Sequence, residues 1–202
     1  MRVLVACEYS GTVRDAFIRA GHEAMSCDLL ATDASGPHFQ GDVKEIINDG
    51  WDLMIAHPPC TYLCSSGLHW NKRRPERAAQ TEEALQFVRF LLQAPIERIA
   101  LENPIGCIST CIRKYDQVIQ PYDFGDNASK QTCLWLKNLP RLVPTNRVAG
   151  RMVVTPSGKT VERWNNQCDN YGQDKTSPGP DRWKIRSATY KGIADAMADQ
   201  WG

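Results

Sequence analysis

The stretch RVLVAC, at residues 2–7, is a short apolar run rich in β-branched side chains, which indicates a buried strand. Residues 12–20 follow, with apolar side chains at helical spacing on one face: Val13, Ala16, Phe17 and Ala20. Gly21 ends this predicted helix. A buried strand followed directly by a short helix is typical of the first half of a β-α-β unit.

The same alternation continues along the chain. It predicts strands at residues 24–29, 51–56, 96–101 and 132–136, and helices at residues 43–48, 76–93 and 190–201. Strands alternating with helices favour an α/β fold with a mostly parallel, Rossmann-like sheet. Over residues 143–183 Pro, Gly, Asn and Asp dominate, and only 151–154 and 160–163 look like strands. We therefore expect a single domain over residues 1–202, with 143–183 as a short irregular insertion that packs on the main sheet as a loop or hairpin.

The composition is that of an ordinary globular protein, because 42% of the 202 residues are hydrophobic and 23% are charged. No apolar run approaches the ~20 residues that span a bilayer, and the first residues show no export signal. A cytoplasmic protein with no membrane partner and with reduced cysteines is therefore expected. The spacings Cys60-x3-Cys64 and Cys107-x3-Cys111 are compatible with zinc, but no His pair accompanies them, so no metal is expected.

The basic residues are distributed unevenly. The net charge is only +1, but between Arg141 and Arg186 nine Lys and Arg stand against four Asp and Glu. A basic segment suits a partner that carries phosphates, and a solvated basic loop is an equal alternative. Trp70 lies close to the basic run Lys72-Arg73-Arg74, where it could stack on a base or belong to a solvated loop.

Polar and reactive residues follow the predicted strands. They are Glu8–Gly11 after the first strand, Asp28 at the end of the second, Gly41-Asp42 further on, His57–Cys60 after the third, and Glu102–Pro104 after the fourth. The carboxyl ends of parallel strands meet at one edge of a sheet, where ligands bind. We therefore expect these five segments to converge on one rim.

Three of these positions suit a nucleoside. Ser10-Gly11 opens the first predicted helix, whose N-terminus favours a carboxylate or phosphate, although a plain helix cap is the simpler alternative. Asp28 could accept hydrogen bonds from ribose hydroxyls. Asp42 could do the same or cap the next helix. Taken together, the three positions predict a nucleoside-binding edge.

Cys60 is the strongest candidate for a nucleophile, because Pro58 and Pro59 fix the backbone before it. A thiolate is a strong nucleophile if its pKa is lowered, and a buried structural thiol is the alternative. Glu102 could donate a proton if burial raised its pKa, and a surface acid is the alternative. His57 is expected to serve in packing or backbone hydrogen bonding and not as a base for Cys60.

In their order along the chain, these segments resemble the motifs of the cytosine-5 DNA methyltransferases. Residues 8–11 resemble the first cofactor motif of that family, and Asp28 and Gly41-Asp42 match its next two cofactor contacts. DLMIAHPPC at 52–60 resembles the Pro-Cys nucleophile motif, and ALENP at 100–104 the Glu-Asn motif. FGDNASKQTCLW at 124–135 resembles the segment near the substrate phosphate, and residues 191–201 resemble the closing helix.

The resemblance implies a class I S-adenosylmethionine-dependent methyltransferase fold and methyl transfer to C5 of cytosine in DNA. It implies that Cys60 attacks C6 of the base and that Glu102 binds the base through hydrogen bonds. It implies that S-adenosylmethionine is held by Tyr9, Ser10, Gly11, Asp28, Asp42 and Pro58. The substrate would be held by Asn103, Lys130, Arg147 and Arg151.

The sequence departs from that family in two respects. Only about 40 residues, 143–183, stand where the family carries a large target-recognition domain, and Lys130 is the nearest substitute for its paired arginines. Compact relatives of this kind resemble those of bacteriophages, which would place the protein in a host cytoplasm. Three alternatives stay open: methylation of a free cytosine nucleotide, an inactive nucleic-acid-binding relative, and a cysteine-dependent amidohydrolase.

Overall fold

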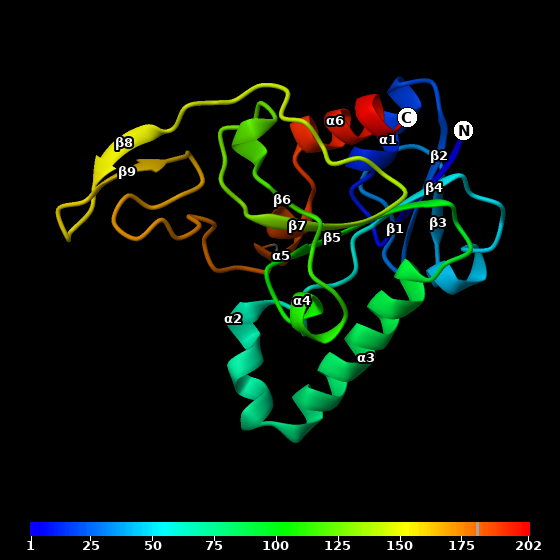
Figure 1. Cartoon of the computed structure of the whole chain (residues 1–202), viewed down its shortest axis with the longest axis horizontal. Helices are drawn as coiled ribbons and strands as arrows, with labels where there is room; N and C mark the ends of the chain where they lie inside the picture. The colour runs from blue at the N-terminus through cyan, green and yellow to red at the C-terminus, as the bar shows by residue number, and fades with distance from the viewer. Residues whose placement is uncertain (181) are drawn as a thin grey trace.

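The core of the molecule is a seven-stranded sheet. In the computed structural model, which describes residues 1–180 and 182–202, the strand order is β3-β2-β1-β4-β5-β7-β6 (Figure 1). The first five strands in this order run parallel, and β7 runs antiparallel to both β5 and β6. The predicted mostly parallel α/β sheet is therefore confirmed.

The elements alternate along the chain as the sequence pattern indicates. The strands are β1 (Arg2–Ala6), β2 (Glu23–Asp28), β3 (His38–Gln40), β4 (Leu53–Ala56), β5 (Arg98–Pro104), β6 (Gln117–Ile119), β7 (Thr132–Lys137), β8 (Arg151–Val154) and β9 (Thr160–Arg163). The α-helices are α1 (Thr12–Arg19), α2 (Ser65–Leu68), α3 (Pro75–Leu92), α4 (Ile108–Cys111), α5 (Arg182–Ser187) and α6 (Lys191–Trp201). Short 3-10 helices are η1 (Val43–Glu45), η2 (His69–Lys72) and η3 (Pro121–Asp123).

Helices cover both faces of the sheet. Successive side chains of a strand point to opposite faces, so Val3 and Val5 of β1 join the core under α1 and α6, whereas Leu4 joins the core under α3. All three side chains are fully buried. Burial of each contributes about 1.5–3 kcal/mol, which explains why this apolar run forms the central strand.

Helix α3 begins at Pro75, whose fixed φ suits the first helical position. Leu85, Val88 and Leu91 recur every three residues and are the side chains that it buries against the sheet. None of the described helices is long and apolar enough to cross a membrane.

The fourth predicted strand is longer than its apolar pattern. Strand β5 continues to Pro104, because Glu102, Asn103 and Pro104 stay in register with residues 132–134 of β7. Glu102 therefore lies on a strand and not in the loop after it, which corrects the expected position. The three-residue strands β3 and β6 were not predicted, since three residues are too few to show a periodicity.

Residues 143–183 contain the two predicted strands, which pair as the hairpin β8–β9. The hairpin forms a sheet of its own on an arm that projects from the body (Figure 1). Trp164 stacks on Tyr122 at 3.9 Å between ring centroids, and Asn166 exchanges hydrogen bonds with Ser129. The arm therefore packs on the segment that precedes β7, and the expectation that it packs on the main sheet is wrong.

Candidate active site

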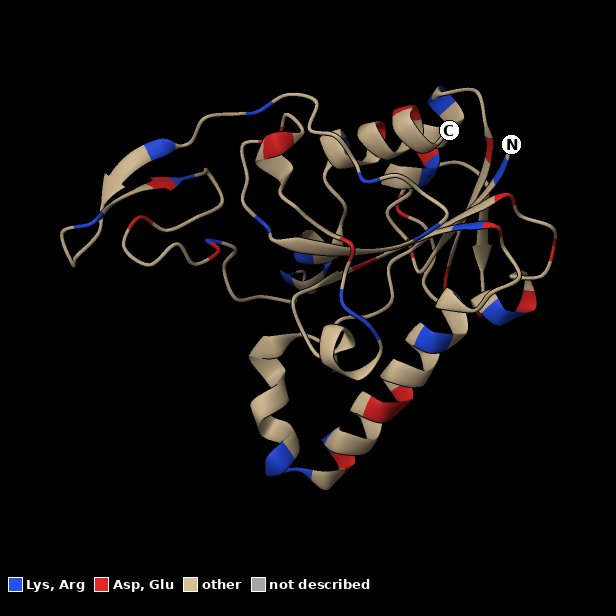
Figure 2. Cartoon of the chain, viewed as in Figure 1, with Lys and Arg blue, Asp and Glu red and all other residues tan. Residues whose placement is uncertain are grey.

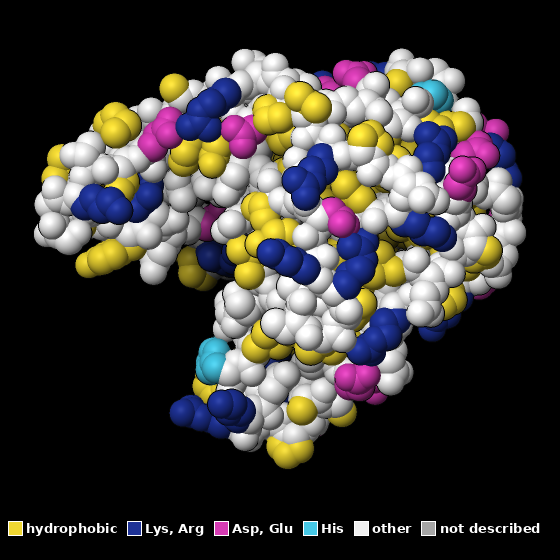
Figure 3. Space-filling model, in the orientation of Figure 1, with side chains coloured by type: hydrophobic (Ala, Val, Ile, Leu, Met, Phe, Trp, Pro, Cys, Tyr) yellow, Lys and Arg dark blue, Asp and Glu magenta, His cyan; other side chains and the backbone are white. Residues whose placement is uncertain are grey.

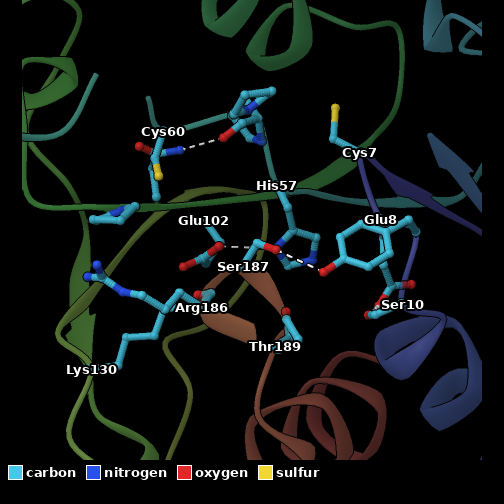
Figure 4. A pocket seen from close by; sticks show the side chains of 16 residues that line it. Cys7, Glu8, Ser10, His57, Cys60, Glu102, Lys130, Arg186, Ser187 and Thr189 are labelled. Carbon is cyan, nitrogen blue, oxygen red and sulfur yellow. Dashed lines mark hydrogen bonds and ion pairs between the residues drawn. The ribbon is translucent and has the colours of Figure 1, made fainter. Parts of the chain in front are cut away.

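A pocket of about 110 Å³ lies at the carboxyl end of the parallel strands (Figure 4). Three of its walls come from the segments after β1 and β4 and from the end of β5, and the fourth comes from Lys130 and the end of α5. The lining residues are Cys7, Glu8, Tyr9, Ser10, His57, Pro58, Pro59, Cys60, Glu102, Asn103, Pro104, Lys130, Arg186, Ser187, Ala188 and Thr189.

The structure brings seven of the expected site residues to this pocket: Tyr9, Ser10, Pro58, Cys60, Glu102, Asn103 and Lys130. The other five, Gly11, Asp28, Asp42, Arg147 and Arg151, do not line it. Segments that lie about 90 residues apart in sequence thus converge on one rim, as the strand order requires.

Cys60 is held by a rigid loop. Its carbonyl oxygen accepts hydrogen bonds from Leu63 N at 3.0 Å and Cys64 N at 2.9 Å, which close a turn directly after the two prolines. Asn103, which is 1% exposed, donates from Nδ2 to the carbonyl oxygen of Pro58 at 2.7 Å. This contact ties the Cys60 loop to β5, and it gives Asn103 a structural role that the sequence did not indicate.

The Cys60 thiol is protonated in this environment. Burial raises its pKa above the ordinary value, and the neighbouring Cys64 and the charge of Glu102 add to the shift. The charge of Lys130 opposes these effects without overcoming them. A lowered pKa is therefore not found for Cys60, and the reactive thiolate would need additional positive charge or a base near Sγ.

Glu102 points into the pocket from β5 (Figure 4). Its Oε2 lies 3.1 Å from Nδ1 of His57. Burial favours the protonated carboxyl, but the hydrogen bond from His57 and the charge of Lys130 outweigh it and lower the pKa. The raised pKa that a proton-donor role would need is therefore not found, and Glu102 is a carboxylate at neutral pH.

The first helix receives its N-terminal cap from Glu8. This buried side chain accepts hydrogen bonds from Val13 N at 2.7 Å and from Arg14 N at 3.2 Å. The protein's own carboxylate thus occupies the place that we expected a ligand's carboxylate or phosphate to take. Gly11 has φ +72° and lies against the buried Arg14, since an added Cβ would be 2.4 Å from its Nη2 atom.

Asp28 and Asp42 lie next to the pocket at the same edge of the sheet. The negative charges of both raise the pKa of Cys7, which lines the pocket, in addition to the larger effect of burial. Asp42 caps η1 by accepting from Lys44 N at 3.0 Å, which is the structural alternative that the sequence left open. Asp28 accepts from Leu30 N through Oδ1 alone, and its Oδ2 has no hydrogen bond to a described residue.

The basic residues fall into two groups. Lys130 lies at the pocket and donates from Nζ to the carbonyl oxygen of Arg186 at 2.8 Å. Arg147 bridges Asp123 and Glu162 at 3.1 and 3.0 Å, and Arg151 pairs with Asp169 and two carbonyl oxygens. The structure therefore shows both arginines holding the arm together, and their expected contact with the substrate stays a prediction.

Two parts of the site were missed from the sequence. The bond between His57 and Glu102 was not foreseen, although a histidine directly after a buried strand was a signal for it. The second part is the wall formed by α5, where Tyr9 donates from its hydroxyl to the carbonyl oxygen of Lys184 at 2.7 Å and also bonds Ser187. No sequence pattern marks this contact, because it joins residues 175 positions apart.

The described residues contain no group of three or more His, Cys, Asp and Glu side chains arranged to hold a metal ion. All eight cysteines are free thiols.

Comparisons with known proteins bear on the fold. No family model matches the sequence, and neither does any curated protein. One similar solved structure is described as a candidate DNA modification methyltransferase encoded within an E. coli prophage, with TM-score 0.49 and 17% identity over 99% of this chain and 69% of that one. Another is the methyltransferase EhMeth of Entamoeba histolytica, with TM-score 0.50 and 15% identity over 74% of this chain.

This chain spans 58% of the length of EhMeth. At 15% identity the likeness bears on the fold alone, which here is a mostly parallel sheet with the antiparallel strand β7 between β5 and the edge strand β6. The expected fold class is therefore confirmed: the chain has the α/β fold of the class I S-adenosylmethionine-dependent methyltransferases.

Proposed function

We propose that this protein transfers a methyl group from S-adenosylmethionine to C5 of cytosine in DNA, with Cys60 as the nucleophile. The observation that carries the proposal is that Cys60, in the loop after β4, and Glu102, on β5, line one pocket at the carboxyl edge of a methyltransferase-type sheet. Ligands bind at this edge in open α/β sheets.

Cys60 would act by covalent catalysis. Its Sγ, as thiolate, forms a bond to C6 of the base, and the electron pair of the C5–C6 double bond becomes available at C5 for the incoming methyl group. The C5 proton then leaves, the Sγ–C6 bond breaks and the double bond forms again. The turn after Pro58 and Pro59 fixes the main chain of Cys60, from which Sγ reaches the base.

Glu102 would stabilise the base while Cys60 is bonded to it. The carboxylate can accept a hydrogen bond from the exocyclic amine of cytosine and can offset positive charge at a protonated N3. Because the pKa of Glu102 is lowered, the proton at N3 would enter together with the substrate and would not reside on Glu102 beforehand.

The residues present suit the proposed cofactor. When bound, S-adenosylmethionine supplies an electrophilic methyl group. Asp28, with Oδ2 available, would accept the ribose hydroxyls, while Tyr9, Ser10 and Pro58, which line the same pocket as Cys60, would contact the rest of the cofactor. Gly11 and Asp42 would support this edge by packing Arg14 and by capping η1.

The pocket is small for such a ligand, because sites for drug-sized molecules measure about 300–1,000 Å³. Its volume of about 110 Å³ is limited by α5, which Tyr9 holds through Lys184 and Ser187. The Trp183 ring adds a contact at 5.7 Å from the Tyr9 ring. Binding of the cofactor would therefore displace α5 from Tyr9.

The substrate would lie near the hollow between the arm and the lobe that contains α2 and α3 (Figure 3). Lys and Arg residues are present on the arm and at the tip of this lobe (Figure 2). At the tip, Arg73 and Arg74 lie 5.7 and 5.1 Å from the Trp70 ring, which is 39% exposed. An exposed ring with two guanidinium groups that form no ion pair with the described residues suits a base and a phosphate.

Phosphate contacts position a strand but carry no sequence information. Lys130 would hold the phosphate nearest the pocket, Asn103 would fix the loop beneath the base, and Arg147 and Arg151 would add positive charge along the arm. The arm is too small to be a separate recognition domain, so we propose weak sequence selectivity, with single strands or free cytosine nucleotides as the alternative substrate.

The amidohydrolase alternative receives no support from the geometry. A hydrolase would need His57 to accept the proton of the Cys60 thiol, and among the described residues no hydrogen bond joins Nε2 of His57 to that thiol. A binding protein without activity remains a second candidate, since the Cys60 thiol is protonated at rest. A bacteriophage origin and a place in the host cytoplasm stay part of the proposal.

The cofactor assignment is tested by calorimetry. The wild-type protein is expected to bind S-adenosylmethionine, and Asp28→Ala is expected to weaken binding by about 1.5–3 kcal/mol, roughly tenfold to 150-fold, because hydrogen bonds to a charged group are lost. Asp33→Ala, which removes the acid that pairs with Lys184 on α5, serves as the matched control and should not weaken binding. No binding by the wild type would end the cofactor assignment.

The nucleic-acid surface is tested by binding titrations at several salt concentrations. Affinity for single-stranded DNA is expected to fall with salt by about 0.7 log units per phosphate contact for each log unit of salt. Lys130→Gln, Trp70→Ala and Arg151→Gln should each weaken binding, whereas Arg19→Gln, the same loss of charge on α1, should not. Tight binding to one duplex sequence that is insensitive to salt would contradict the proposal.

A further inference from the structure

His57 is not a surface histidine. It follows β4 directly, and its backbone N–H donates to the carbonyl oxygen of Ala6 at 2.9 Å, which fixes its main chain to β1. Its side chain is only 11% exposed, and the ring lines the pocket beside Glu102 (Figure 4).

The two ring nitrogens have different surroundings. Nδ1 lies 3.1 Å from Oε2 of Glu102, whereas Nε2 is buried and has no hydrogen-bond partner among the described residues. An ionised carboxylate can only accept hydrogen bonds, so the proton of the pair is on Nδ1.

The charged and titratable groups that face Glu102 come from three elements. They are His57 after β4, Cys60 on the same loop, Lys130 before β7 and Cys133 on β7. Lys130 also has a hydrogen bond to the carbonyl oxygen of Arg186, and both thiols have raised pKa values. In this set His57 is the side chain that donates a directed hydrogen bond to Oε2, and the Thr132 side chain on β7 is a second hydrogen-bonding group beside the carboxylate.

We propose that His57 is a positioning residue for Glu102: its Nδ1–H holds Oε2 and so directs Oε1 of the carboxylate towards the substrate base. This inference rests on the proposed methyl transfer, because it assigns Glu102 the contact with the base. A carboxylate is symmetric and rotates readily, and one fixed oxygen gives the other a single direction. The same hydrogen bond favours the ionised form of Glu102.

Two variants of His57 separate this role from simple packing. In His57→Asn the amide N–H takes nearly the place of Nδ1–H, whereas His57→Leu fills similar space without a donor. A packing role predicts that Leu is the better replacement, and a positioning role predicts that Asn is.

The direct measurement is an NMR titration of the protein labelled with ¹³C at the glutamate carboxyl groups. The signal of Glu102 is identified by its absence from the spectrum of Glu102→Gln. In the wild type the signal should titrate below the ordinary glutamate value of 4.5. It should titrate at higher pH in His57→Leu and close to the wild type in His57→Asn. If His57→Leu does not fold, His57→Gln is measured in its place. The amide of Gln lies one methylene farther out than that of Asn, so its N–H does not take the place of Nδ1–H.

The second readout is steady-state methyl transfer. We expect His57→Leu to lower kcat at least tenfold with little change in the KM for S-adenosylmethionine, and His57→Asn to recover most of this loss. An unchanged Glu102 titration in His57→Leu, or an Asn variant no better than Leu, would overturn the inference. If the wild type transfers no methyl group but the titrations behave as expected, the proposed function fails while the bond from His57 to Glu102 is upheld.

Discussion

Cys60→Ser is expected to fold, to bind S-adenosylmethionine as well as the wild type, and to lose methyl transfer by a factor on the order of a thousand or more. The hydroxyl is a far poorer nucleophile than a thiolate at neutral pH, and the turn that holds residue 60 uses only backbone atoms, which serine keeps. Initial rates with labelled cofactor, measured with single-stranded and duplex DNA, would give the loss directly.

Cys64→Ser is the matched control for this variant. Cys64 lies one turn further along the same loop and is not among the residues that line the pocket. Its Sγ lies 3.2 Å from the hydroxyl of Ser66, where a serine oxygen can be accommodated. This variant should stay active, and full activity in Cys60→Ser would end the proposed mechanism.

A covalent adduct adds a second test of Cys60. An oligonucleotide that contains 5-fluorocytosine has no C5 proton to lose, so the Sγ–C6 bond should persist and mass spectrometry should place it on Cys60. The pKa of Cys60 is raised, so the thiolate is scarce at neutral pH and adduct formation should become faster as the pH rises towards that pKa. A rate that does not depend on pH would show that the substrate complex creates the thiolate by other means.

The sheet could be predicted because its strands are buried on both faces. The runs at β1, β4 and β5 are continuous and apolar, and the helix pattern of α3 repeats over 18 residues, so the signals are strong. The end of β5 could not be predicted, because Glu102 to Pro104 remain in the strand only through pairing with β7. The paired residues lie about 30 positions apart in the sequence, so the local hydrophobic pattern does not reveal the pairing.

The site could be predicted in part for the same reason. Residues that follow parallel strands must meet at one edge, which placed Cys60 and Glu102 together without any knowledge of side-chain contacts. The protonation of these residues could not be predicted, since it depends on neighbours such as His57 and Lys130 that act across the pocket. The wall formed by α5 depends on one hydroxyl that reaches a distant carbonyl, and such contacts have no periodicity.

Glu102→Gln is the variant that tests how the base is held. The amide N–H can bond N3 and the amide oxygen can still accept from the exocyclic amine, but the negative charge that offsets a protonated N3 is lost. We expect kcat to fall by about 10²–10⁴-fold, the usual range for a lost acid or base, with unchanged affinity for S-adenosylmethionine. Calorimetry with the cofactor and single-turnover methyl transfer would separate the two quantities.

The same variant has an effect on Cys60 that does not depend on catalysis. The charge of Glu102 is one of the causes that raise the pKa of Cys60, so its removal should lower that pKa and increase the thiolate fraction at a given pH. Alkylation of Cys60 by iodoacetamide should therefore be faster in Glu102→Gln than in the wild type, even though methyl transfer is slower. Should cofactor affinity fall as much as the rate does, Glu102 would belong to the cofactor site, and its assignment to the base would be wrong.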